Sequence, residues 1–153
     1  MRESQLKPQF AIVIGGAGSR KNYFLEHNPT LSSYKLVDVD AIKGELGVSA
    51  AISAIKPMLT NAFAKKVNVV HPTTASNLPA QKNKIAAAKA AGYSVDLYLV
   101  DTPVERAIAQ VRNRVRDGGH DVDIDKIVSS NAKARESYNL LAPLVDKAQV
   151  VNN

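Results

Sequence analysis

Residues 15–22 have the residue types and the spacing that phosphate binding needs. The segment reads Gly-Gly-Ala-Gly-Ser-Arg-Lys-Asn and follows a short apolar run. Small residues let several backbone N–H groups turn toward one anion, and a lysine ammonium can reach the outer phosphates of a nucleoside triphosphate. Gly15 and Lys21 stand where the pattern G-x-x-x-x-G-K-[ST] has its first glycine and its lysine. The segment predicts a phosphate-binding loop formed by Gly15, Gly16, Ala17, Gly18, Ser19, Arg20, Lys21 and Asn22.

Two positions of this segment depart from that pattern. Arg20 replaces the second glycine, so its side chain either distorts the phosphate cradle or supplies another contact to the anion. Asn22 replaces the serine or threonine whose hydroxyl binds Mg²⁺, and its amide oxygen predicts a weaker metal ligand at the same place. The alternative for the whole segment is a glycine-rich turn that binds no ligand.

The loop needs a strand before it and a helix after it, and the surrounding pattern predicts both. Short apolar runs alternate with longer helical segments, which is typical of a parallel sheet covered by helices. Strands are predicted at residues 10–14, 35–39, 67–70, 95–100 and 148–151. Helices are predicted at residues 21–27, 40–64, 79–91, 103–116 and 125–141. The predicted fold is therefore α/β, with a parallel sheet of about five strands and helices on both faces.

Local capping chemistry marks three of the predicted helix ends. Asn77 precedes one helix and Thr102 another, and each is followed by a proline in the first turn. Gly92 ends the helix of residues 79–91, because glycine readily adopts the left-handed conformation that closes many helices.

Length and composition are typical of a single globular domain. The 153 residues suffice for one packed core, predicted to span residues 1–153 with a flexible N-terminus at residues 1–8. The lack of cysteine excludes disulfides, thiolate chemistry and cysteine-bound zinc. We expect a cytoplasmic protein with no membrane partner, since we find neither a signal peptide nor a long apolar stretch. A net charge of +6 favours an anionic partner such as a nucleotide, a sugar phosphate or nucleic acid.

Nearly the whole chain resembles the zeta-toxin-like and polynucleotide-kinase-like branch of the P-loop kinases. Besides the loop, residues 37–43 are similar to a family motif in which an aspartate after the second strand is followed three residues later by a basic residue. The resemblance implies a P-loop NTPase fold in which Asp40 orients and deprotonates the substrate hydroxyl and Lys43 helps to bind the acceptor. A carboxylate suits that task, because a hydroxyl that attacks a phosphoryl group must lose its proton. The alternative is that Asp40 only caps the helix that follows.

A third segment with a counterpart in the family is residues 69–77. The resemblance implies that Thr73 and Thr74 contact the substrate; the alternative is that they end the strand and cap the next helix. His71 stands where an acidic residue is usual in the family, and imidazole is a poor ligand for Mg²⁺. We therefore expect His71 to be structural rather than catalytic.

Four arginines precede a glycine pair at residues 118–119. Similar kinases use arginines here as a lid that closes over the triphosphate, with a glycine hinge behind it. Arg112 and Arg116 lie four residues apart and share one helix face, so they are the predicted lid arginines, whereas Arg114 is predicted to point elsewhere. The alternative is a solvated basic face, or contacts to nucleic-acid phosphates.

Together these features predict ATP-dependent transfer of the γ-phosphoryl group to a hydroxyl of a nucleotide sugar, a polynucleotide or another small acceptor. The predicted cofactors are ATP or another nucleoside triphosphate and, with Asn22 as a ligand, Mg²⁺. By resemblance, the polar pair at residues 152–153 lies near the adenine. The alternatives are a kinase fold without catalysis that binds a nucleotide or a protein, and a basic nucleic-acid-binding module. The predicted catalytic residues are Lys21, Asp40, Arg112 and Arg116.

Overall fold

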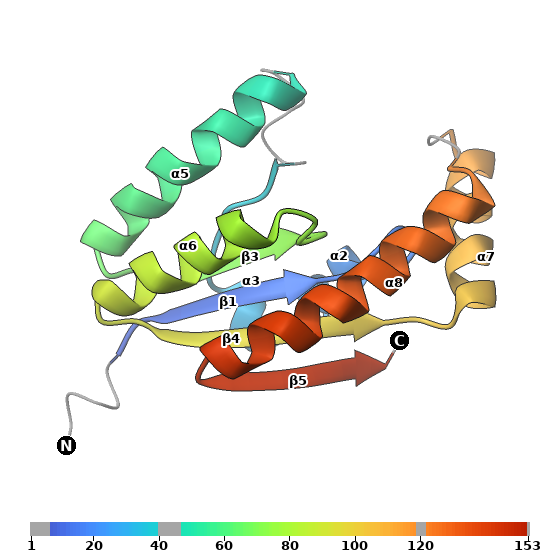
Figure 1. Cartoon of the computed structure of the whole chain (residues 1–153). Helices are drawn as coiled ribbons and strands as arrows, with labels where there is room; N and C mark the ends of the chain where they lie inside the picture. The colour runs from blue at the N-terminus through green and yellow to red at the C-terminus, as the bar shows by residue number, and fades with distance from the viewer. Residues whose placement is uncertain (1–6, 40–46, 119–121, 153) are drawn as a thin grey trace.

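Parallel strands form the centre of the computed structural model, which describes residues 7–39, 47–118 and 122–152 of the chain (Figure 1). The strands are β1 (Gln9–Ile14), β2 (Lys35–Leu36), β3 (Val69–Thr73), β4 (Ser94–Asp101) and β5 (Lys147–Asn152). Their order across the sheet is β2-β3-β1-β4-β5, and each adjacent pair runs parallel. This confirms the predicted parallel α/β sheet.

β1 lies in the middle of the sheet, with β3 on one side and β4 on the other. The chain first builds the side of β2 and β3 and later the side of β4 and β5. At such a switch point the connections from neighbouring strands diverge, which opens a crevice beyond the carboxyl ends of the strands. The segment that follows β1 therefore enters the crevice where open α/β sheets commonly bind ligands.

Helices connect the strands where the sequence pattern predicts them. They are α2 (Lys21–Glu26), α3 (Pro29–Ser32), α5 (Val48–Ala64), α6 (Leu78–Ala90), α7 (Val104–Arg116) and α8 (Ile124–Leu141), and a 3-10 turn at Ala142–Leu144 precedes β5. The pattern misses α3, although its signal is local: Asn28 Oδ1 accepts a hydrogen bond from the N–H of Leu31 at 3.0 Å. Of the helix predicted at residues 40–64, residues 40–46 lie outside the described part of the chain. Among the described helices, none has the length and apolar composition that a membrane crossing requires.

The second strand is shorter than the predicted range of residues 35–39. Only Lys35 and Leu36 form β2, and one further hydrogen bond, from the N–H of Val37 to the carbonyl of Val70 at 3.0 Å, extends its pairing with β3. β2 is the outermost strand on this side of the sheet, and both of its residues are exposed. Short outer strands are common, because an unpaired strand edge invites association with other chains.

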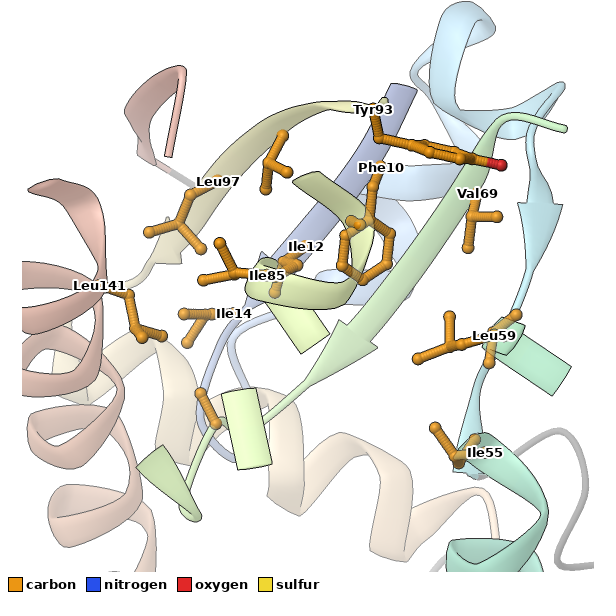
Figure 2. Close-up of a cluster of buried hydrophobic side chains, with 14 of the residues drawn as sticks. Phe10, Ile12, Ile14, Ile55, Leu59, Val69, Ile85, Tyr93, Leu97 and Leu141 are labelled. Atoms are coloured by element: carbon orange, nitrogen blue, oxygen red, sulfur yellow. The ribbon is translucent and has the colours of Figure 1, made fainter. Parts of the chain in front are cut away.

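Helices cover both faces of the sheet (Figure 1). One face packs against α5, α6 and α8, and Figure 2 shows part of this cluster, which includes Phe10, Ile12, Ile14, Leu59, Ile85 and Leu141. On the other face Ala11 and Val13 pack against Leu25 of α2 and Leu31 of α3. Burial on both faces explains why β1 is a continuous apolar run, and it fixes the strand from which the loop departs.

Two of the three predicted helix ends are confirmed and one is wrong. Asn77 Oδ1 accepts a backbone hydrogen bond at 3.1 Å at the start of α6, and Gly92 follows the end of α6 with a φ of 88°. Thr102 does not cap α7, because the N-cap is Pro103 and no side chain caps it. The hydroxyl of Thr102 donates to the carbonyl of Ser19 at 3.0 Å instead, so this threonine serves the predicted phosphate loop.

Candidate functional site

The segment after β1 folds into a tight loop at the carboxyl edge of the sheet. The N–H of Gly15 donates to the carbonyl of Thr73 at 3.3 Å, which anchors the start of the loop to the end of β3. Gly18 and Arg20 both have left-handed backbone conformations, with φ of 74° and 67°. Left-handed residues among right-handed ones turn successive N–H groups toward one side of the chain, which is how anion-binding nests form.

Two glycines let α7 and α8 pack directly on this loop. A β-carbon added at Gly16 would lie 2.6 Å from the backbone nitrogen of Asn131 in α8. One added at Gly18 would lie 2.3 Å from the carbonyl oxygen of Ala107 in α7. Both distances are far below van der Waals contact, and backbone atoms cannot swing aside as side-chain ends can. Only glycine allows the loop to sit between these two helices.

Three polar side chains from other elements hold the backbone of the loop. The N–H of Ala17 donates to Ser130 Oγ at 2.9 Å, and Asn131 Nδ2 donates to the carbonyl of Ala17 at 2.8 Å. On the other flank, Thr102 Oγ1 donates to the carbonyl of Ser19 at 3.0 Å. Because these hydrogen bonds need no ligand, the loop is ordered before anything binds, which lowers the entropic cost of binding.

Lys21 begins α2, and its side chain turns back over the loop. Its Nζ donates to the carbonyl of Gly15 at 2.9 Å, so the ammonium lies beside the first residue of the loop. This is the place that the sequence pattern assigns to the lysine of a phosphate loop, from which an ammonium reaches the outer phosphates.

Arg20 has its guanidinium over an aromatic ring. Its Cζ lies 3.9 Å from the centroid of the Tyr23 ring, and that ring stacks on the imidazole of His27 with centroids 4.0 Å apart. The three side chains form a column along α2, held by a cation–π contact and by ring stacking. A fixed Arg20 side chain therefore stands beside the loop.

A cavity of about 380 Å³ opens over the loop. Its lining joins the loop to residues that come much later in the chain, and it consists of residues 16–23 with Thr74, Gln110, Arg114 and Ser130. The predicted phosphate loop and a basic helix thus face the same space, with Thr74 of the β3–α6 connection between them.

The arginine of α7 that lines this cavity is not one of the two that the spacing predicted. Arg114 lines it together with Gln110, which lies four residues earlier on the same helix face. Arg112 lines a separate hollow near the start of α8, and Arg116 Nη2 donates to Asn113 Oδ1 at 2.8 Å. Arg114 faces a different space from Arg112, as the helical spacing predicts. The catalytic roles of Arg112 and Arg116 stay predictions.

The orientation of α7 follows from its buried face. Ala107 and Val111 pack against Ile127 of α8, and Gln110 and Arg114 each lie three positions further along the helix. Helical spacing shows which arginines share a face, but it does not show which face meets the loop. The buried pair Ala107 and Val111 is the sequence signal that identifies that face.

The two threonines predicted to bind substrate are placed differently. Thr74 is exposed and lines the cavity, where its hydroxyl can contact a ligand. Thr73 Oγ1 accepts a hydrogen bond from the N–H of Ala75 at 3.0 Å, and Ala75 has a left-handed φ of 58°. Neither threonine caps α6, because Asn77 does. Substrate contact stays a prediction for both residues.

A second cavity, of about 360 Å³, lies at the carboxyl ends of β4 and β5. Its lining includes Thr102, whose hydroxyl bonds to the predicted phosphate loop, and an ion pair between Arg135 Nη1 and Asp101 Oδ1 at 3.1 Å. Asn152, one of the polar residues predicted to lie near the adenine, also lines this cavity. Thr102 therefore links this second cavity to the loop that lines the first.

The family model for zeta toxins matches residues 39–153, which is most of the chain. The chain belongs to the zeta toxin family. The matched residues begin after the loop of residues 15–22, so the match does not include that loop. Among curated proteins, no sequence matches the chain.

Solved structures share the fold of this zeta toxin family member. A chain of the Pnkp1/Rnl/Hen1 RNA repair complex superimposes with a TM-score of 0.73 at 16% identity, over 87% of this chain and 46% of that one. The PezAT toxin–antitoxin system of Streptococcus pneumoniae gives 0.73 at 16% identity, over 96% and 69%. Shikimate kinase from Acinetobacter baumannii gives 0.51 at 16% identity, over 98% and 88%. The present chain thus spans less than half of the RNA repair chain.

Some residues that the family resemblance singles out cannot be placed. Asp40 and Lys43, predicted to prepare and bind the acceptor, lie outside the described residues, as does Gly119 of the predicted hinge. The described residue nearest to Asp40 is Val39, three positions after the end of β2. The roles of Asp40 and Lys43 stay predictions.

His71 lies buried in the core of the chain. It is 1% exposed, and its Nδ1 lies 2.7 Å from the carbonyl of Val37 while its Nε2 lies 3.0 Å from Lys84 Nζ. Burial, together with the charge of Lys84, lowers the pKa of His71 to about 4. A neutral imidazole can donate from Nδ1 to the carbonyl and accept at Nε2 from the ammonium. This arrangement supports the structural role expected for His71.

The zeta toxin family and its fold imply Mg²⁺ with the nucleotide. Asn22, in the first turn of α2, is exposed and lines the first cavity, and its amide oxygen is a ligand type that Mg²⁺ accepts. Within the described residues there is no group of three or more histidine or acidic side chains that would hold a metal by themselves. Mg²⁺ at nucleotide sites commonly keeps waters and takes further oxygens from the phosphates. The residues present therefore fit Mg²⁺ with Asn22 as one protein ligand.

Proposed function

We propose that the chain transfers the γ-phosphoryl group of ATP, or of another nucleoside triphosphate, to a hydroxyl group of an acceptor. The observation that carries this proposal is the ordered loop after β1, closed by the hydrogen bond from Lys21 Nζ to the carbonyl of Gly15 and open to a cavity with a facing arginine. Membership of the zeta toxin family and a kinase-like fold support the same reaction class.

The residues around the cavity suggest how the reaction proceeds. The loop amides and the Lys21 ammonium bind the outer phosphates, and Arg114 approaches from α7 to balance the negative charge of the transferring group. The family resemblance assigns the next step to Asp40, which accepts the proton of the acceptor hydroxyl as the hydroxyl oxygen bonds to the γ-phosphorus. The bond from that phosphorus to the bridging oxygen breaks, and the nucleoside diphosphate leaves. Mg²⁺, with Asn22 as a ligand, would neutralise phosphate charge when bound.

The second cavity suits the nucleoside end of the triphosphate. It lies next to the loop through Thr102, at the carboxyl ends of β4 and β5. Its lining offers the planar guanidinium of Arg106 and the amide of Asn152, two groups that can stack on or hydrogen-bond to a base. We therefore place the base there and the phosphates in the first cavity.

The acceptor class is a further part of the proposal. A nucleotide sugar, a polynucleotide end or another small hydroxyl compound fits the family resemblance, and the similarity to a chain of an RNA repair complex favours testing an RNA end. The similarity to a toxin–antitoxin system makes a protein antitoxin a partner to test.

Thermal unfolding with ATP, in the presence and absence of Mg²⁺, tests nucleotide binding. A ligand that binds only the folded chain raises the unfolding temperature, by about 5 °C when it is present at about a hundred times its dissociation constant. Lys21→Ala should abolish the shift, whereas Lys56→Ala, which removes an exposed charge of α5, should keep it. No shift at millimolar ATP in the unchanged chain would contradict the proposal.

The departures at Arg20 and Asn22 favour one second candidate, a kinase fold that binds the nucleotide without turnover. Release of ADP from ATP, followed with a panel of nucleotide sugars, 5′-hydroxyl oligonucleotides and small alcohols, separates the two. Binding that depends on Lys21, without ADP release in any mixture, would support the second candidate.

A further inference from the structure

Arg20 holds a backbone conformation that its side chain disfavours. Its φ of 67° and ψ of 40° lie in the left-handed region of backbone conformations. This region raises the conformational free energy of most residues that have a β-carbon, whereas glycine adopts it readily. The phosphate-loop pattern also has glycine at this position. An arginine that occupies such a position at a candidate binding site points to a role for its side chain.

The Arg20 side chain is held at the cavity by its neighbours on α2. The Tyr23 ring supports the guanidinium at 3.9 Å, and the His27 imidazole backs that ring at 4.0 Å. His27 is itself fixed, because its Nδ1 lies 2.9 Å from the carbonyl of Tyr23. Stacking uses the flat face of a guanidinium, whereas its N–H groups point outward in the plane of the group. A stacked arginine therefore remains suited to binding an anion at its edge.

The charge of the cavity lining favours an anion at this point. Among the described residues that line the cavity are three cations, Arg20, Lys21 and Arg114, and no aspartate or glutamate. Arg20 and Lys21 come from the loop side, and Arg114 comes from α7. A ligand between them meets positive charge from two directions, as the outer end of a triphosphate would.

We propose that Arg20 is a phosphate-binding residue, with Tyr23 as its positioning residue, and that its guanidinium binds the terminal phosphate of the triphosphate. This inference rests on the proposed function, because it assigns a further residue to the same site. Only ATP has a phosphate at the γ position, so a guanidinium that binds there discriminates ATP from ADP. At position 20 the chain therefore has a second cation next to Lys21, in place of the flexible glycine of the pattern.

A pair of substitutions separates the guanidinium from the β-carbon. Arg20→Ala removes the guanidinium and keeps the left-handed strain, whereas Arg20→Gly removes both. We expect both variants to weaken ATP binding by about tenfold and ADP binding by about twofold or less, because hydrogen bonds to a charged partner are among the strong ones. Only Arg20→Gly should unfold at a higher temperature than the unchanged chain, by a few degrees.

Tyr23→Leu tests the positioning role. Leucine keeps an apolar side chain but removes the ring that holds the guanidinium, so we expect ATP binding to weaken by about threefold with ADP binding unchanged. Calorimetric titration with ATP and with ADP measures each dissociation constant. Unchanged ATP binding in Tyr23→Leu would overturn the part assigned to Tyr23.

The outcomes distinguish this inference from the proposed function. If the unchanged chain binds ATP and Lys21→Ala does not, the phosphate site stands, and Arg20 is tested by its own variants. Arg20→Gly that binds ATP as tightly as the unchanged chain, or more tightly, would then overturn the inference and identify Arg20 as an obstruction of the loop. If the unchanged chain does not bind ATP, the proposed function fails first and the inference fails with it.

Discussion

The two sides of the cavity over the loop are held in place by different means. On one side, Gly16 and Gly18 bring the loop against the backbones of α8 and α7, and Asn131 bonds to the loop from a buried position. On the other side, Arg114 projects from α7 as an exposed side chain. The fold shapes the first side before a ligand arrives, whereas the second side is a charged side chain that a ligand can draw into position.

This difference separates two kinds of substitution effect. Changes on the loop side alter packed or buried groups, so they should lower the free energy of unfolding and nucleotide binding together. Changes on the arginine side remove exposed charges, so they should alter nucleotide binding or turnover with little effect on stability.

Gly18→Ala is the strongest test of the loop side. A β-carbon there would lie 2.3 Å from the carbonyl oxygen of Ala107 on a backbone with a φ of 74°, so both overlap and strain oppose it. We expect a loss of about 4 kcal/mol in the free energy of unfolding, measured by urea denaturation.

Gly118→Ala is the matched control for this substitution. Gly118 also has a left-handed φ, of 94°, but an added β-carbon would meet none of the described atoms within 4 Å. It should therefore cost only the backbone strain, about 1 kcal/mol. Equal losses at Gly18 and Gly118 would mean that packing of α7 does not fix the loop.

The loop side also includes β3, which anchors the loop and contains His71. Because burial lowers the pKa of His71 to about 4 in the folded chain, the unfolded chain takes up this proton at higher pH, near 6.5. The contribution of His71 to stability is therefore complete above pH 6.5 and is lost as the pH falls toward 4, by about 3 kcal/mol. Urea denaturation at several pH values measures this slope.

Two glutamine variants isolate the histidine responsible. His71→Gln should flatten the change between pH 6.5 and 4, although the variant starts from a lower stability. His27→Gln removes an exposed histidine directly after α2 and should leave the slope as it is. If the slope survives His71→Gln, another group is the source of the pH dependence.

Asn131→Ala removes a single brace of the loop. The Asn131 amide donates to the carbonyls of Ala17 and Ile127, both at 2.8 Å, and the residue is 3% exposed. Loss of both bonds should cost about 2 kcal/mol of unfolding free energy and should weaken ATP binding, because the loop loses part of its preorganisation. Ser129→Ala, an exposed change on the same helix, should cost about 0.5 kcal/mol or less. Unchanged ATP binding in Asn131→Ala would show that the brace serves stability alone.

The same difference between the two sides explains what the sequence reveals. The strand, the glycines and Lys21 could be predicted because they are local: an apolar run, small residues and a lysine follow one another. The side chains that hold the loop could not be predicted, because Thr102, Ser130 and Asn131 bond to backbone groups that are distant in the sequence. The separations are 83, 113 and 114 positions, respectively. Buried polar side chains give no sign in the sequence of the backbone group that they will meet.

The orientation of α7 does not follow from the spacing of its arginines alone, for a related reason. The spacing of the arginines defines helix faces, but the face that turns to the loop depends on where Ala107 and Val111 find a partner, and that partner is Ile127 of another helix. The end of α6 was predictable because Gly92 stops a helix by its own conformation.

A comparison of Arg114→Ala with Arg112→Ala tests the arginine side, where we expect the smallest effect. Arg114 lines the loop cavity and Arg112 does not, so Arg114→Ala should lower ATP affinity or kcat by about tenfold, with less than about 0.5 kcal/mol of change in stability. Arg112→Ala is exposed on the same helix and therefore controls for lost charge. If Arg112→Ala has the larger effect on kcat, the lid predicted from helical spacing is right, and α7 must turn its other arginines toward the phosphates during the reaction. Because neither change touches the packing of the loop, either result measures the arginine side alone.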